Sequence, residues 1–328
     1  MSIQKMILWR VFEAFFVLWA ISLIMFVLIE TMPGDFASAT APRFTPPDQV
    51  AAFRERMGLN VAPVLRYFVW IGNAFQGDLG TSWSVWVRDP DGSYEVQVFD
   101  HLVDRIGNTL ILTGLAGAMA FPIGFLAAIV SVRFPGSFFD WGSSATSLGL
   151  ISIPEFVSAM LLTAIFVVQI PVFPAHVAFH ADMGWGEWLN GLILPAASIA
   201  IIAIAPVLRL TRACLLEVMR SEYIVMARLK GVGAMRIIWR HALPNALPAI
   251  VNTFVVVLGN LIIGAFVVEQ IFAYPGVGQA MLNAIQVRDM PLVLGISMAF
   301  ALIFVVLNLL ADIISILATP RLRNRDIS

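Results

Sequence analysis

The sequence predicts an all-α polytopic membrane protein with six transmembrane helices, and three observations support that fold class. Hydrophobic residues make up 59% of the chain and charged residues only 12%, whereas soluble globular domains carry about 25% charged residues. The mean hydropathy is +0.87. The apolar residues form six long segments, each of which can provide the roughly 20 helical residues that cross about 30 Å of hydrocarbon.

The predicted spans are 9–30, 108–132, 143–171, 190–213, 249–271 and 292–317. In the first span, a long apolar run follows Lys5 and Arg10 and continues to Ile29 without a small-residue cleavage site, so we interpret it as an anchor and not as a cleaved signal peptide. Proline and glycine inside the later spans are compatible with membrane helices, because neighbouring helices can satisfy the freed backbone groups.

The distribution of Lys and Arg predicts that both termini are cytoplasmic. Lys5, Arg10, Arg133, the basic segment 214–247 and the C-terminal arginines share one side, and Lys and Arg in short loops favour the cytoplasm. The long region 31–107 then faces the periplasm. Its turn-rich insert near 86–97 is expected to be exposed to solvent, and its sequence does not show whether it contacts a partner.

The segment 214–247 is predicted to be a structured cytoplasmic docking surface. Gly231 and Gly233 separate two short helices, and Pro244 and Pro248 are expected to restart the chain toward the membrane. A basic elbow of this kind suggests a soluble partner, although its charges also serve as plain topology markers. Seven of the chain's 20 lysines and arginines lie in the segment or just before it: Arg209, Arg212, Arg220, Arg228, Lys230, Arg236 and Arg240.

The sequence shows no catalytic constellation and no GxxxxGK phosphate loop, so we expect no ATP binding by that device. His176 and His180 have a spacing that could share a metal, but no third ligand is fixed nearby, and we expect two ordinary loop histidines. The acids Glu13, Glu269 and Asp312 lie near span ends. Structural anchoring is favoured for them over a proton relay. The net charge of −1 is divided among loops and does not indicate nucleic-acid binding.

Ala227, Gly231 and Leu243–Pro244 resemble the signature of inner-membrane permease subunits of ATP-binding-cassette importers. Further blocks, in family order along essentially the whole chain, narrow the resemblance to the first permease of the dipeptide/oligopeptide/nickel family. These blocks are MPGD (32–35), RMGL (56–59), GDLGTS (77–82), RIGNTL (105–110), SIPEF (152–156), ARLKG (227–231), RHALPNAL (240–247), VVEQIFAYPGVG (267–278), RDMPLV (288–293), NLLAD (308–312) and PRLR (320–323).

The resemblance implies a type I importer permease fold, with residues 1–328 as a single transmembrane domain in the bacterial inner membrane. It implies four kinds of partner: a second homologous permease subunit, two cytoplasmic ATPase subunits, a periplasmic solute-binding protein and the lipid membrane. ATP and Mg would bind the ATPase subunits, and this chain would hold no cofactor.

The resemblance also assigns residues. The coupling helix that docks on the ATPase would comprise Tyr223, Ala227, Arg228, Gly231, Val232 and Arg236. A structural motif would comprise Glu269, Pro275, Gly276, Gly278 and Asp312. The implied substrates are di- and oligopeptides or peptide-like solutes, with oligosaccharides or nickel chelates as alternatives. A stand-alone secondary transporter is the alternative class; it would need coupling charges inside the membrane or internal symmetry, and neither is clear in the sequence.

Overall fold

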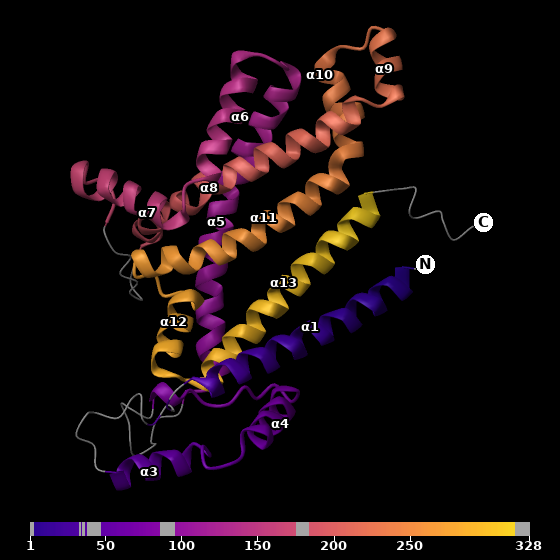
Figure 1. The fold of residues 1–328 in the computed structure, drawn as a ribbon. Helices are drawn as coiled ribbons and strands as arrows, with labels where there is room; N and C mark the ends of the chain where they lie inside the picture. The colour runs from indigo at the N-terminus through magenta and orange to yellow at the C-terminus, as the bar shows by residue number, and fades with distance from the viewer. Residues whose placement is uncertain are drawn as a thin grey trace. The chain divides into compact units, whose positions relative to one another are not determined.

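A computed structural model describes residues 3–32, 34, 37, 47–85, 96–174 and 184–318 (Figure 1). The described residues form helices and turns, and they contain no β-strand, only an isolated bridge between Thr81 and Gln97. The elements are α1 (Ile3–Thr31), α3 (Pro47–Arg56), α4 (Pro63–Ala74), η1 (Trp83–Val85), α5 (Val98–Arg133), α6 (Phe138–Ile151), α7 (Glu155–Thr163), η2 (Ala164–Gln169), α8 (Trp185–Met219), α9 (Glu222–Leu229), α10 (Ala234–Ile237), η3 (Ile238–Ala242), α11 (Leu243–Ile271), α12 (Val277–Val287) and α13 (Met290–Ala318).

The described helices confirm an integral membrane protein of the predicted fold class. Five are long and apolar enough to cross a membrane, and the bent pair Phe138–Ile151 and Glu155–Gln169 makes a sixth if it counts as one span. The five are Leu8–Thr31, Val98–Arg133, Trp185–Met219, Ala234–Ile271 and Met290–Ala311. Each predicted span coincides with one of these candidates.

The third predicted span, 143–171, is not one continuous helix. The chain bends by 98° between Ile151 and Glu155, because Pro154 cannot donate a backbone hydrogen bond and disfavours a helical conformation at the residue before it. Pro154 has extended angles, φ −62° and ψ 144°, and serves as the N-cap of α7. The bend therefore places the N-terminus of a helix inside a candidate span.

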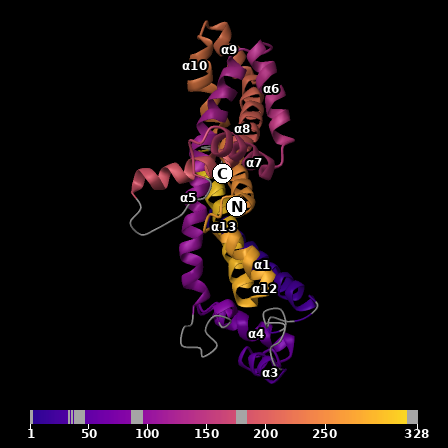
Figure 2. The same cartoon turned by 90° about the vertical axis from the view of Figure 1, so that its left-hand side faces the viewer.

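The described chain divides into two compact units, and the boundaries fall within α5, between α11 and α12, and within α13. The first unit comprises Thr109–Tyr274 and the chain from Val306 onward. Its core lies between α8 and α11, which run side by side (Figure 1), and α6 also packs along α8 (Figure 2). Fully buried side chains of this core include Leu112, Leu192, Ile199, Val257 and Leu261.

The second unit comprises Ser2–Asn108 and Pro275–Val305. Val98, Val277 and Ile296, from α5, α12 and α13, are buried together in its core. Tyr67 of α4 is also buried, and its hydroxyl lies 2.9 Å from the hydroxyl of Ser22 in α1. Packing of this kind joins the N-terminal and C-terminal parts of the chain in one unit.

Asp289 fixes the start of α13 in the second unit. It is fully buried, and its Oδ1 accepts a bond of 3.2 Å from the backbone N–H of Leu292. Its Oδ2 accepts bonds from the Ser82 hydroxyl at 2.6 Å and from the Ser84 backbone N–H at 2.8 Å. A buried carboxylate needs such donors to offset its lost hydration. The GDLGTS and RDMPLV blocks are thus joined by a direct hydrogen bond.

We predict that Gly124→Ala destabilises the first unit by about 1–3 kcal/mol, the usual cost of overpacking a core. A Cβ at Gly124 of α5 would lie 2.7 Å from Val207 Cγ1 and 2.9 Å from the backbone oxygen of Ile204, both in α8. Gly114→Ala is the matched control on the same helix, because a Cβ there meets nothing within 4 Å. Thermal unfolding in detergent measures both, and equal stabilities would contradict the close packing of α5 on α8.

Candidate functional site

Helices α9 and α10 form an elbow, residues 221–242, between the two long helices α8 and α11 (Figure 1). The elbow is fixed by apolar burial. Ile224 of α9 and Ile237 of α10 are at most 1% exposed and belong to one cluster with Ile129 of α5, Leu215 of α8 and Ile250 of α11. The elbow is therefore packed rigidly against three of the long helices.

The turn after α9 is a Schellman motif, a helix ending in which two reversed hydrogen bonds surround a left-handed residue. Val232 N–H donates to Ala227 O at 3.2 Å, and Gly231 N–H donates to Arg228 O at 2.9 Å. Gly231 has φ +77°, a conformation that side chains with a Cβ adopt at a cost. Ala227 and Val232 both pack against the apolar cluster of the elbow. The four-residue spacing from Ala227 to Gly231 is thus the spacing that this turn requires.

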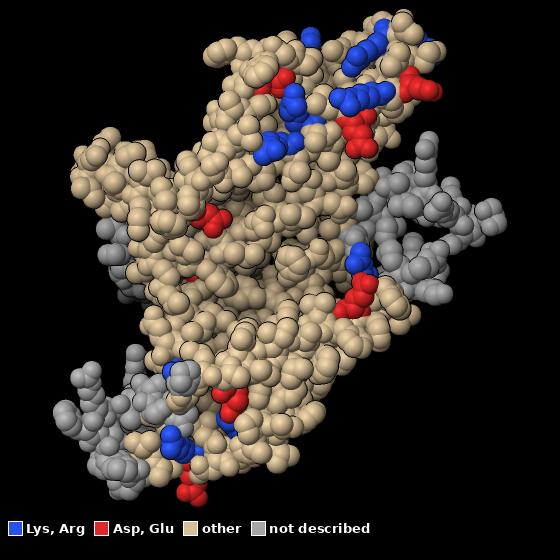
Figure 3. Space-filling view, in the orientation of Figure 1, with Lys and Arg blue, Asp and Glu red and all other residues tan. Residues whose placement is uncertain are grey.

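The outer surface of the elbow combines apolar side chains with cations. Val225, Met226 and Leu229 are 47%, 54% and 76% exposed. Basic residues of the same segment are also exposed. In Figure 3 blue side chains gather over this end of the unit, with some red ones beside them, whereas the surface over α8 and α11 is largely tan. These basic residues are Arg228, Lys230, Arg236 and Arg240. An exposed apolar patch rimmed by polar residues is typical of an interaction surface.

The chain leaves the elbow without the restart that was predicted at its prolines. Residues Ala234–Ile271 form one helical run, with a π-helical turn over Ile238–Ala242. Pro244 lies in the first turn of α11 and Pro248 lies inside the helix. Proline is tolerated in a first helical turn, and a π turn widens the helix locally. The prolines therefore shape a continuous helix instead of beginning a new one.

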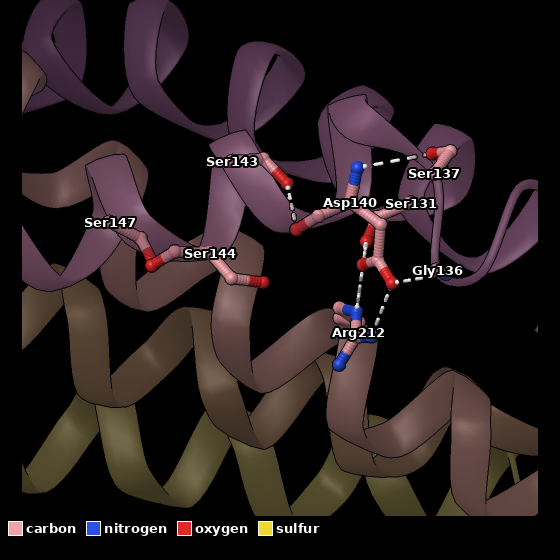
Figure 4. A network of polar contacts seen from close by, with 8 residues as sticks. All are labelled: Ser131, Gly136, Ser137, Asp140, Ser143, Ser144, Ser147 and Arg212. Atoms are coloured by element: carbon pink, nitrogen blue, oxygen red, sulfur yellow. Dashed lines mark hydrogen bonds and ion pairs between the residues drawn. The ribbon is translucent and has the colours of Figure 1, made fainter.

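Asp140 and Arg212 form an ion pair near the elbow (Figure 4). Arg212 Nε of α8 lies 2.9 Å from Asp140 Oδ1 of α6, and a second guanidinium nitrogen lies 3.0 Å from Oδ2. The hydroxyl of Ser131, in α5, accepts a bond of 2.8 Å from Arg212 Nε and donates to Asp140. The pair thus joins α5, α6 and α8. No local pattern in the sequence predicts this pair, because its two residues are 72 positions apart.

Glu269 is fully buried in α11 and accepts a hydrogen bond of 2.6 Å from the hydroxyl of Thr109 in α5. The backbone N–H of Tyr274 donates to the backbone oxygen of Glu269 at 2.9 Å. The pKa of the Tyr274 hydroxyl is raised by burial and by the negative charge of Glu269, so this tyrosine stays protonated. Glu269 is thus held by contacts between α5 and α11 within the first unit.

Pro275, Gly276 and Gly278 lie at the start of α12 in the second unit. The Asn108 side chain donates to Pro275 O at 2.9 Å, Gly276 is the N-cap of α12, and Gly278 is buried. The side chain of Asp312, residues 86–95 of the insert, and His176 with His180 lie outside the described residues. Within the described part, no three His, Cys, Asp or Glu side chains are placed to hold a metal ion.

Sequence comparisons with known proteins find membrane components of transport systems. A family model described as "Binding-protein-dependent transport system inner membrane component" matches residues 120–324, and the model of the corresponding N-terminal region matches residues 3–113. Oligopeptide transport system permease protein AppB of Bacillus subtilis (strain 168) is 31% identical, with 93% of this chain and 95% of that protein covered. Dipeptide transport system permease protein DppB of Alkalihalophilus pseudofirmus is 30% identical, with 94% and 96% covered.

The fold has a counterpart among solved structures. A chain from inward-facing conformations of the MetNI methionine ABC transporter aligns with a TM-score of 0.51 and 20% identity, covering 66% of this chain and 95% of that one. This similarity confirms the predicted type I importer permease fold.

We predict that Gly231→Ser loosens the elbow by about 1 kcal/mol, because a residue with a Cβ is strained at φ +77°. No contact contributes, since a Cβ at Gly231 meets nothing within 4 Å. Gly233→Ser is the control: Gly233 has φ −60° and is the N-cap of α10, a position that serine favours. Hydrogen exchange of the backbone amides in 226–232 should quicken about fivefold in the first variant only. Equal exchange in both variants would mean that the turn is not left-handed at Gly231.

We predict that Asp140 and Arg212 are coupled by about 1–2 kcal/mol in a double-mutant cycle, because removal of either partner leaves the other charge without its ligand. The variants are Asp140→Asn, Arg212→Gln and the pair, compared by unfolding in detergent. Ser144→Ala is the control on the same face of α6, since the bond at Ser144 is made by its backbone oxygen. Additive effects of the two substitutions would show that the ion pair does not fix α6 on α8.

Proposed function

The chain belongs to the family of binding-protein-dependent transport system inner membrane components, and we propose that it is the permease subunit of an importer for di- and oligopeptides. The AppB and DppB relatives, which are named as oligopeptide and dipeptide transport permeases, support the peptide substrate. The transporter would contain a second homologous permease and two ATPase subunits, and a periplasmic binding protein would deliver the peptide.

The single observation that carries the proposal is the surface of the elbow. It presents exposed apolar side chains on α9, while Ile224 of α9 and Ile237 of α10 are buried on the inner side of the elbow. A loop that served only to mark topology would need positive charge alone. Exposed Leu229 and Met226, on a short segment that also carries exposed cations, indicate a surface that a protein partner covers. We assign that partner as the ATPase.

Transmission of movement follows from how the elbow is packed. Tyr223, Ala227, Arg228, Gly231, Val232 and Arg236 would form the docking face and its supporting turn. The elbow shares one apolar cluster with α5, α8 and α11, so an ATPase that closes on ATP would move these helices with it. The permease would alternate between inward-open and outward-open states as a two-state element.

The same proposal sets the location and the chemistry. The elbow and both termini would be cytoplasmic, residues 31–107 periplasmic, and the chain would lie in the bacterial inner membrane. ATP and Mg would bind the partner subunits, and the permease would hold no cofactor. The whole chain would act as one transmembrane domain, with 214–247 as its coupling region. Glu269, Pro275, Gly276, Gly278 and Asp312 would keep structural roles.

The experiment is co-purification of the ATPase with Leu229→Asp. Leu229 is 76% exposed, so the substitution should leave the permease folded, while an anionic group at the centre of the docking face should weaken ATPase association at least tenfold. Leu229→Met is the matched control and should retain association. Unchanged ATPase binding and unchanged peptide uptake by Leu229→Asp, at equal membrane abundance, would refute the role of the elbow.

A further inference from the structure

Glu155 is a carboxylate at the bend in the third span, and within the described part of the chain its side chain has no hydrogen-bond or ion-pair partner. It is the first residue of α7, which begins inside a candidate span. The side chain is half-buried. A helix N-terminus favours an ionised acid beside it, but this position supplies no donor side chain that would hold the carboxylate in a closed contact.

The carboxylate is seated in a space that a glycine leaves open. A Cβ at Gly264 of α11 would lie 2.6 Å from Oε1, 2.7 Å from Cδ and 2.8 Å from Oε2 of Glu155. All three atoms therefore lie where a side chain at 264 would stand. One turn further along α7, the Ser158 hydroxyl donates to the Ser198 backbone oxygen at 2.8 Å. This bond fixes α7 on α8, and with it the position of Glu155.

The position of Glu155 along the candidate spans limits what its exposed side can contact. Gly264 lies seven residues before the end of α11 at Ile271, which corresponds to about 10 Å of helix. An unpaired charged acid is costly against lipid, by roughly 2.5–3.5 kcal/mol or more at the centre of a membrane helix. Intramembrane acids almost always face a bundle interior or a water-filled cavity. By this rule, the half-exposed side of Glu155 is expected to face water, a passing solute or a partner subunit, and not hydrocarbon.

We propose that Glu155 is a substrate-contacting residue that binds ammonium groups of peptides as they cross the membrane, and that Gly264 seats its carboxylate for this purpose. The inference rests on the proposed peptide import and adds a charge preference within the membrane. A peptide carries an α-ammonium and often Lys or Arg side chains. A carboxylate with unused acceptor positions pairs with such cations by charge-assisted hydrogen bonds.

The test is import by the complete transporter in proteoliposomes, with saturating binding protein loaded with Ala-Lys-Ala or Ala-Glu-Ala. For each permease, the ratio of the maximal rates for the two peptides is measured. The same binding protein serves every variant, so its own preference cancels. Glu155→Gln should lower the Lys-to-Glu ratio about three- to tenfold, and Glu155→Lys should lower it further. A purely structural role would lower both rates and the stimulated ATP hydrolysis together and leave the ratio unchanged, which would overturn the proposal.

Two further outcomes are decisive. A loss of import in the Glu155 variants that depends on pH but not on peptide charge would assign Glu155 to proton handling and would also overturn the proposal.

If the wild-type transporter imports neither peptide, the proposed substrate class is wrong. The water accessibility of position 155 then tests the site independently of the substrate. In a Cys214→Ser background, Glu155→Cys should react with a charged, water-soluble thiol reagent, whereas Ala159→Cys, at a fully buried position, should not. Absence of reaction at position 155 would show that it does not face water.

Discussion

The arrangement of this protein depends on one constraint: inside a membrane, every backbone N–H and C=O must find a partner within the protein. Long helices meet that constraint, and the described chain is built almost wholly from them. Two departures from regular helix lie beside prolines. At Pro154 the chain bends and begins a new helix, whereas at Pro244 and Pro248 it passes through a π turn and continues. The same residue type therefore gives two outcomes, according to whether the neighbouring turn can widen.

Polar contacts between helices follow from the same constraint. Asp140 with Arg212, Thr109 with Glu269, and Ser158 with Ser198 each join two helices of the first unit. Each contact places a donor opposite an acceptor, so these polar groups are not buried without a hydrogen bond. Glu155 differs from these residues, because its carboxylate occupies the space that the missing side chain of Gly264 leaves, and no donor among the described residues lies opposite it. That difference separates a group available to a ligand from groups that hold the helices together.

Much of the architecture could be predicted from the sequence because the signals are local. Runs of apolar residues marked each span, and Gly231 marked the turn of the elbow, since few other residues adopt φ +77° easily. The bend at Pro154 was missed because hydropathy does not distinguish a bent apolar segment from a straight one. The partner of Asp140 could not be predicted, because 72 residues separate it from Arg212 and no local pattern records which helices meet. The apolar cluster under the elbow could not be predicted either, since its residues are spread along the sequence from Ile129 to Ile250.

The bonds of Asp289 have a consequence for the order in which the protein is made. Ser82 and Asp289 are 207 residues apart, and the second unit is assembled from the first hundred residues and a segment near the end of the chain. Translation proceeds from the N-terminus, so α1 and α4 are made long before α12 and α13 exist. Contacts of such high separation form late and slowly. The first unit, by contrast, is largely one continuous stretch, Thr109–Tyr274, and can fold while the ribosome is still engaged. During synthesis the N-terminal helices therefore remain without their packing partners until α12 and α13 are made. A truncated chain that ends before Asp289 would leave them exposed to membrane quality control.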